Sequence, residues 1–251
     1  MTVRILTKLD IKQGRVIKGV EFEGVRQVGD PIELAKKYYL QGIDEIIYLD
    51  CVASLYNRNH LIDLLPRVSE QVFVPICAGG GIKNFNDAKL LFDNGADKIA
   101  INTGAVKNPL ILKKISEFYG QQAVVLQVDC KKLSEEKYEV YTDYGREKTG
   151  LDVFKWIEKA IKMGIGEILL TVIDKDGKKN GLDIDLYKKI SLKFNIPIIA
   201  CGGTSNLSDV YKIFKINNIK AICISTIFHY NLTSPKILKK KLKLKNIDVR
   251  I

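Results

Sequence analysis

Two aspartates occupy matching places in this chain and could share acid and base chemistry. Asp10 lies in the stretch TKLDIK and Asp129 in the similar stretch LQVDCK, each at the end of an apolar run. Paired carboxylates in a partly desolvated site can act as acid and base, because their different surroundings separate their pKa values. A helix cap or a salt bridge is the structural alternative for a single aspartate of this kind, and the duplication makes it weaker.

Two glycine pairs with polar side chains nearby could cradle phosphates. Residues 80–81 and 202–203 are both Gly-Gly, and the apolar runs that follow end in Asn-Thr (102–103) and Ser-Thr (225–226). Glycine lets a ligand approach backbone N–H groups, and a helix N-terminus after it favours an anion. One such turn is usually only a turn. Two in register predict a substrate with a phosphate at each end.

These matches belong to an internal repeat. The stretches PICAGGGIKNFND (75–87) and PIIACGGTSNLSD (197–209) are identical at seven of thirteen positions, and the same shift places GIDEI (42–46) on GIGEI (164–168). The repeat is far longer than a solenoid unit of ~20–50 residues. We therefore expect a single domain over residues 1–251, built from duplicated halves of approximately 1–120 and 121–251.

Apolar runs alternate with amphipathic helical patterns along the chain. The eight expected strands are VRILTKL (3–9), EIIYLD (45–50), VFVPICA (72–78), KIAIN (98–102), AVVLQVD (123–129), EILLTVI (167–173), IPIIAC (196–201) and AICIS (221–225). Nearly continuous apolar strands are typical of a buried parallel sheet. Helices are expected over 31–42, 87–95, 110–120 and 151–163 and from near 183, 205 and 234, with an extra hairpin over 134–150. The pattern predicts an α/β fold, a (β/α)8 TIM barrel. A doubly wound open sheet is the alternative, and the half-length repeat favours the barrel.

Such a barrel places its active site where the strands end. Its first and fifth strands lie opposite each other, so Asp10 and Asp129 should face each other across one mouth. Charged residues begin four of the strands and should form a ring at the other end: Arg4, Glu45, Lys98 and Glu167. A structural salt-bridge layer is the simplest explanation of that ring.

Composition excludes several classes of protein. The net charge of +11 suggests nucleic-acid binding, but no recognition motif accompanies it, and the lysine run at 239–243 is typical of a solvated helix face. We expect no nucleic acid and no membrane partner, since no run of ~18 apolar residues exists. The N-terminus does not resemble a secretory signal, which favours a cytoplasmic location. The five cysteines form no CxxC motif and neither histidine lies at ligand spacing from one, so we expect no metal and no cofactor.

The chain resembles the cyclase subunit of imidazole glycerol phosphate synthase (HisF), a family of histidine biosynthesis. The resemblance covers essentially the whole chain. It is carried by LDIKQGRVIKGVEFEGVRQVGDP (9–31), AGGGI (78–82), GADKIAINT (95–103), GEILLTVIDKDG (166–177), ACGG (200–203) and IFHY (227–230). The VIKGVEFE loop and the charged ring favour this family over the related ribonucleotide isomerase, which is also a half-barrel repeat.

The resemblance implies a glutaminase subunit (HisH-like) docked on the N-terminal face of the barrel, with Asp97 facing it. Ammonia then passes through the barrel and adds to a bisphosphorylated phosphoribulosyl-formimino carboxamide ribonucleotide. The products are imidazole glycerol phosphate and aminoimidazole carboxamide ribonucleotide.

The resemblance also implies a role for individual residues. Asp10 and Asp129 become the acid/base pair, and Lys18 belongs to a mobile loop. One phosphate is held by Gly81, Asn102 and Thr103, and the other by Asp176, Gly177, Gly203, Ser225 and Thr226. The charged gate of the ammonia passage is formed by Arg4, Glu45, Lys98 and Glu167.

Several residues depart from the family pattern. Lys8 stands where the family usually has Cys, Val172 replaces a usual Ser, Lys178 replaces the Thr of a DGT motif, and the loop CVASLYNRN (51–59) is unusual. A lysine beside Asp10 could change its pKa or the substrate that is accepted. Similar changes occur in HisF-like subunits of surface-glycan pathways. The alternative is therefore an ammonia-channelling subunit for the amidation of a sugar.

Overall fold

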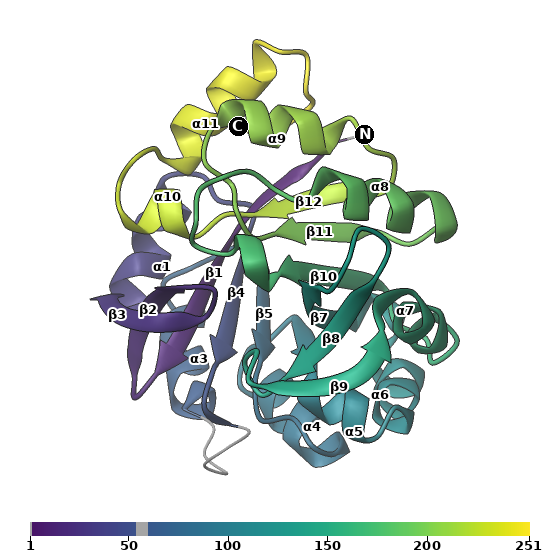
Figure 1. Cartoon of the computed structure of the whole chain (residues 1–251). Coiled ribbons are helices and arrows are strands. Elements are labelled where there is room, and N and C mark those ends of the chain that lie inside the picture. Colours follow the sequence, from purple (N-terminus) through teal and green to yellow (C-terminus); the bar gives the residue numbers. More distant parts are fainter. Residues whose placement is uncertain (1, 54–59) are drawn as a thin grey trace.

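Eight parallel strands close into a barrel in the computed structural model, which describes residues 2–53 and 60–251 (Figure 1). In chain order they are β1 (Arg4–Lys12), β4 (Glu45–Asp50), β5 (Ile76–Gly79), β6 (Lys98–Ile101), β7 (Val124–Lys132), β10 (Glu167–Val172), β11 (Ile198–Cys201) and β12 (Ile219–Cys223). Pairing of β1 with β12 and of β10 with β7 completes the ring. The expected TIM barrel is confirmed and the open sheet is excluded. Most of the 51–59 loop lies outside the described residues.

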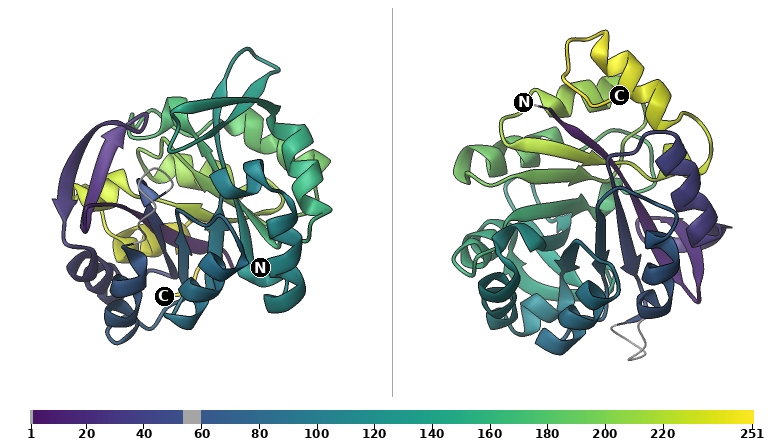
Figure 2. Two further views of the ribbon diagram at one scale, coloured as in Figure 1. Left: turned by 90° about the horizontal axis from the view of Figure 1, so that it is seen from below. Right: turned by 180° about the vertical axis from the view of Figure 1, so that it is seen from behind.

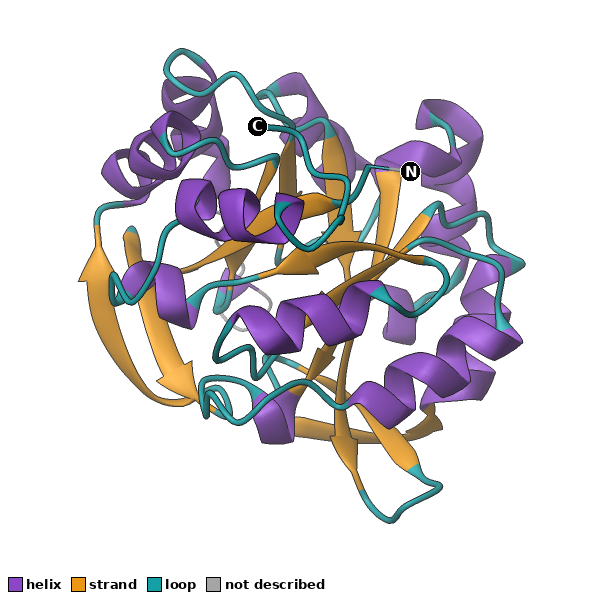
Figure 3. Cartoon of the chain, turned by 90° about the horizontal axis from the view of Figure 1, so that it is seen from above, coloured by secondary structure: helices purple, strands orange, loops and turns teal. Residues whose placement is uncertain are grey.

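Helices surround the barrel (Figure 3). They are α1 (Pro31–Leu40), α3 (Leu61–Ser69), α4 (Phe85–Asp93), α5 (Thr103–Lys107), α6 (Leu110–Tyr119), α7 (Val153–Ile161), α8 (Ile184–Lys193), α9 (Leu207–Phe214), α10 (Thr226–His229) and α11 (Pro235–Lys243). Two short 3-10 turns, η1 (Gln121–Ala123) and η2 (Ile173–Lys175), complete the helical segments. Asn84 and Asn206, which match in the repeat, each begin a helix with a capping box. Within the described part of the chain, no helix is both long and apolar enough to cross a membrane.

Two antiparallel hairpins extend the barrel strands at the carboxyl end. The pair β8 (Tyr138–Thr142) and β9 (Glu147–Asp152) is the hairpin expected after the fifth strand. The pair β2 (Arg15–Val20) and β3 (Glu23–Gly29) was not expected. Since β2 pairs with β1 and β8 with β7, these two barrel strands continue past Asp10 and Asp129. The two aspartates therefore lie inside their strands rather than at the ends, where we expected them.

The barrel interior is apolar between its two polar ends. Side chains from all eight strands meet there: Leu6, Ile47, Leu49, Cys77, Ala100, Val125, Leu169, Ile199, Cys201, Ala221 and Cys223. A larger apolar cluster fills the space between strands and helices. The two chain ends lie at the same end of the molecule, where Val3 forms a parallel bridge with Val249 (Figure 2).

Candidate active site

The two predicted carboxylates lie at the carboxyl end of the barrel, on opposite strands. Leu6 of β1 and Val125 of β7 belong to the interior cluster. Side chains on a strand alternate between its two faces, so Asp10 and Asp129 also point inward. Both are buried, with 1% and 0% of their surface exposed. The barrel thus presents two carboxylates to one enclosed mouth.

The surroundings of the two carboxylates differ. Asn102 and Gln127 donate hydrogen bonds to Oδ2 of Asp129, at 2.8 and 2.7 Å. Burial raises the pKa of Asp129, although these bonds and the charge of Lys8 oppose the increase. Asp10 instead accepts a hydrogen bond from the Tyr144 hydroxyl at 3.3 Å and lies 3.4 Å from Nζ of Lys8. Unequal surroundings of this kind suit one acid and one base.

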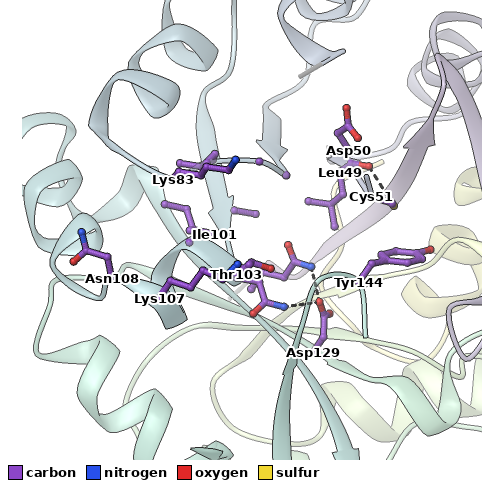
Figure 4. A pocket seen from close by; sticks show the side chains of 17 residues that line it. Leu49, Asp50, Cys51, Lys83, Ile101, Thr103, Lys107, Asn108, Asp129 and Tyr144 are labelled. Atoms are coloured by element: carbon purple, nitrogen blue, oxygen red, sulfur yellow. Dashed lines mark hydrogen bonds between the residues drawn. The ribbon is translucent and has the colours of Figure 1, made fainter. Parts of the chain in front are cut away.

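A cavity of about 370 Å³ opens next to Asp129 (Figure 4). Gly81 and Thr103, both expected to hold a phosphate, line it together with Gly104, Lys83 and Lys107. Thr103 begins α5, and the N-terminus of a helix attracts an anion. The cationic side chains of Lys83 and Lys107 add to that attraction. Gly81 has φ of +71°, and a Cβ there would lie 2.7 Å from Ala53 Cβ, so glycine is required.

Asn102 lines the same cavity, but its amide nitrogen already donates hydrogen bonds to other groups of the protein. Its Nδ2 donates to Asp129 Oδ2 and to the backbone oxygen of Tyr141, at 2.8 and 3.0 Å. In this arrangement Asn102 orients the carboxylate of Asp129.

The residues expected around the second phosphate also come together. Asp176, Gly203, Ser225 and Thr226 line a space of only about 10 Å³. Gly177 packs against the β2–β3 hairpin, since a Cβ there would lie 2.4 Å from the backbone oxygen of Gly19. This side of the mouth is nearly filled by protein.

The β2–β3 hairpin covers that side. Lys18 forms a buried ion pair with Asp176, and Lys178 pairs with Glu21 at 2.7 Å. Phe22 stacks on Tyr144, with ring centroids 4.4 Å apart. The hairpin therefore packs against Tyr144, the residue that donates a hydrogen bond to Asp10.

Two residues near the carboxylates were not expected. Gln127 lies two positions before Asp129 on β7, and the period of two that places both inward could have revealed it. Tyr144 lies between β8 and β9, and no pattern in the sequence connects it with Asp10.

The four predicted ring residues meet at the other end of the barrel. Arg4 forms ion pairs with Glu45 and Glu167. Lys98 contacts the same two carboxylates, at 3.1 and 3.3 Å. Burial raises the pKa of Glu45 against the attraction of Lys98 and Arg4. Asp97 is exposed at this end and accepts a hydrogen bond from the backbone N–H of Ile76 at 2.8 Å. Among the described residues, no group of three or more His, Cys, Asp or Glu side chains could hold a metal ion.

The chain is similar to proteins of one family over its whole length. The family model described as "Histidine biosynthesis protein" matches residues 4–234. The imidazole glycerol phosphate synthase subunit HisF of Methanococcus vannielii is 44% identical, with all of both chains covered. Those of Alkaliphilus metalliredigens and of Bacillus cereus strain G9842 are 42% and 40% identical, with at least 98% of each chain covered. The chain therefore belongs to the histidine biosynthesis protein family and, within it, to the HisF subunits.

Proposed function

We propose that this chain is the cyclase subunit of an imidazole glycerol phosphate synthase. It uses ammonia to convert the phosphoribulosyl-formimino aminoimidazole carboxamide ribonucleotide to imidazole glycerol phosphate and aminoimidazole carboxamide ribonucleotide. The observation that carries the proposal is the pair of buried carboxylates, Asp10 and Asp129, which face one mouth from opposite strands in different surroundings. One protonates the carbonyl oxygen as ammonia adds, and the other assists ring closure and the departure of the carboxamide ribonucleotide.

The two glycine-lined sites flanking the carboxylates support a substrate with a phosphate at each end. Gly81 and Thr103 would bind one phosphate in the open cavity. Gly203, Ser225 and Thr226 would bind the other beside Asp176, and the space of about 10 Å³ between them would have to widen to admit it. Lys18, in the hairpin above, would contact the substrate once its bond to Asp176 is exchanged.

The apolar interior supports transfer of ammonia through the barrel. Ammonia is neutral and small, so an apolar passage carries it better than it carries ammonium, whose burial is costly. The ring of Arg4, Glu45, Lys98 and Glu167 would act as the entrance gate. A glutaminase subunit would dock over this ring at the N-terminal face, near Asp97.

Ammonium-supported turnover of the purified chain tests the proposal. We expect the carboxamide ribonucleotide to be consumed at high ammonium concentration and alkaline pH, where free ammonia is abundant. Asp10→Asn and Asp129→Asn should each lower kcat by at least ~10²-fold, the scale of a lost acid or base. Asp63→Asn, which changes a carboxylate on α3, is the control and should retain activity. A wild-type chain that leaves the substrate untouched would exclude the cyclase.

A second candidate, an ammonia-channelling subunit for sugar amidation, rests on the residues that depart from the family pattern, which include Lys8 beside Asp10 and Lys178 paired with Glu21. That candidate predicts a stimulated glutaminase partner without any cyclisation. The turnover assay therefore separates the two.

A further inference from the structure

Lys8 is a buried cation with incomplete hydrogen bonding. Only 1% of its surface is exposed. Its Nζ lies 3.4 Å from Asp10 Oδ1 and 4.9 Å from the centre of the Phe22 ring. Within the described residues, Nζ has no hydrogen-bond partner, and neither has Oδ1 of Asp10.

Two other lysines among the described residues are buried, Lys18 and Lys239, and both are satisfied. Lys239 donates to the backbone oxygen of Gly42 and to Asp44 Oδ1, both at 2.6 Å. Lys18 donates to Asp176. A buried ammonium without hydrogen bonds is costly, and each such group in a folded protein calls for an explanation. Lys8 thus holds N–H donors ready for a group that is not part of the chain.

The strand geometry shows where that group would lie. Lys8 and Asp10 alternate with Leu9 on β1 and follow Leu6, so both point into the barrel. The Ser225 hydroxyl donates to the backbone oxygen of Lys8 at 2.9 Å and fixes this part of β1. Tyr144 lines the open cavity and also donates to Asp10. A substrate group that displaces the Tyr144 hydroxyl would therefore lie beside Asp10 and Lys8, with an N–H or O–H donor toward Asp10 and an acceptor oxygen toward Lys8.

We propose that Lys8 is a catalytic residue whose ammonium group donates a hydrogen bond to the substrate carbonyl oxygen to which ammonia adds. The assignment rests on the proposed cyclase function and adds to it a residue outside the carboxylate pair. The nitrogen lone pair of ammonia forms the new C–N bond while the C=O π pair moves to oxygen. Lys8 stabilises that developing oxyanion. One carboxylic acid of the pair delivers a proton to the oxygen, and the other carboxylate accepts one from nitrogen, which leaves a neutral carbinolamine.

The electrostatics favour this donor role over covalent catalysis. Burial lowers the pKa of Lys8, but the charges around it, with Asp10 first, outweigh that effect and raise the pKa well above its ordinary value. The amine is therefore protonated at neutral pH and cannot attack a carbonyl as a nucleophile. A preorganised donor aimed at a developing oxyanion contributes ~10²–10³-fold to kcat.

The variant Lys8→Met tests the assignment, because methionine keeps an unbranched apolar chain without the charge. The matched control is Lys239→Met, which removes another buried lysine far along the sequence, on α11. For both variants and the wild type we would measure ammonium-supported kcat and KM, substrate affinity by calorimetry with Asp129→Asn as the inactive background, and the thermal midpoint.

We expect Lys8→Met to lower kcat by ~10²-fold or more with substrate affinity within about threefold, and Lys239→Met to keep kcat. If the wild type is active and Lys8→Met keeps its full kcat, the role of Lys8 is overturned while the cyclase function stands. A loss of kcat that follows a matching loss of substrate affinity would also overturn it. A lower thermal midpoint is expected from the broken ion pair with Asp10, so kcat is compared at a temperature at which both variants are folded. An inactive wild type would overturn the cyclase function and, with it, this assignment.

Discussion

The two carboxylates of the mouth occupy equivalent positions in the sequence repeat, but their surroundings in the structure differ. Asp129 is surrounded by two amide groups, whereas Asp10 is next to a buried cation. Burial raises the pKa of Asp129, although the charge of Lys8 and the two amide donors oppose the increase. This difference has consequences for stability that can be measured separately from turnover.

Asp129→Asn should stabilise the fold at neutral pH while it lowers kcat by at least ~10²-fold. The pKa of Asp129 is raised in the folded chain. Its stabilising contribution is therefore complete below the pKa of an unfolded aspartate, ~4, and is lost as pH rises through the folded pKa. Asparagine cannot ionise and avoids that loss. The thermal midpoint of Asp129→Asn relative to wild type should rise between pH 4 and pH 8. If the thermal midpoints of variant and wild type differ by the same amount at pH 4 and at pH 8, the raised pKa of Asp129 is contradicted.

Asp10→Asn should have the opposite effect. It leaves Lys8 without the carboxylate 3.4 Å away. Removing one partner of a buried ion pair costs ~3–5 kcal/mol, which corresponds to a decrease of roughly 6–20 °C in the thermal midpoint of a domain of this size. Thermal unfolding of the two variants side by side at pH 7 gives the comparison, and equal midpoints would show that the surroundings do not differ as described.

Whether a site residue could be predicted depends on how far apart its interaction partners lie in the sequence. The repeat and the strand period were sufficient to place Asp10 and Asp129 opposite each other. Tyr144 was missed because it lies 134 positions from Asp10 in the chain and meets it only through the β8–β9 hairpin. Asn102 was expected at a phosphate, but its bond to Asp129 depends on the separation of two neighbouring strands.

Among the secondary-structure elements, the sequence did not predict the helices α3, α5 and α10 or the β2–β3 hairpin. The expected strands were recognised as continuous apolar runs, whereas β3 has no buried residue and pairs only with β2. An exposed edge strand needs no apolar pattern, so hydrophobicity gives no signal for it. The hairpin also lies at the edge of the core, and it covers the mouth of the barrel through Lys18, Glu21 and Phe22.

Phe22→Ala should loosen this hairpin without unfolding the barrel. Phe22 stacks on Tyr144 and lies over Lys8, and an aromatic pair contributes ~0.5–1.5 kcal/mol beyond its buried area. Limited trypsin digestion should cut residues 15–29 faster in this variant, while the circular-dichroism melting curve shifts little. Val20→Ala is the control in the same hairpin, because Val20 is 50% exposed. Equal cleavage rates in the two variants would show that the stacked ring does not fasten the hairpin.

The whole barrel is closed at two seams between its expected halves. The seams are the strand pairs β6–β7 and β1–β12. The charged ring crosses both seams, because Arg4 and Lys98 of the first half both bind Glu167 of the second. It therefore joins the halves at the end of the barrel where ammonia would enter.

Lys98→Met should test both the structural role of the ring and its proposed role as a gate. Lys98 lies between Glu45 and Glu167 with its side chain only 20% exposed, so its loss leaves two carboxylates sharing Arg4. We expect a lower thermal midpoint, with a cost below the ~3–5 kcal/mol of a fully buried pair because solvent reaches the ring. Lys89→Met is the control: its bridge to Asp93 is half exposed, and its midpoint should hardly change.

With a glutaminase partner, the ratio of glutamine-supported to ammonium-supported turnover should change in Lys98→Met alone, because externally added ammonia reaches the mouth without the gate. An unchanged ratio together with a lower midpoint would leave the ring as a structural layer and remove the gate from the proposed function.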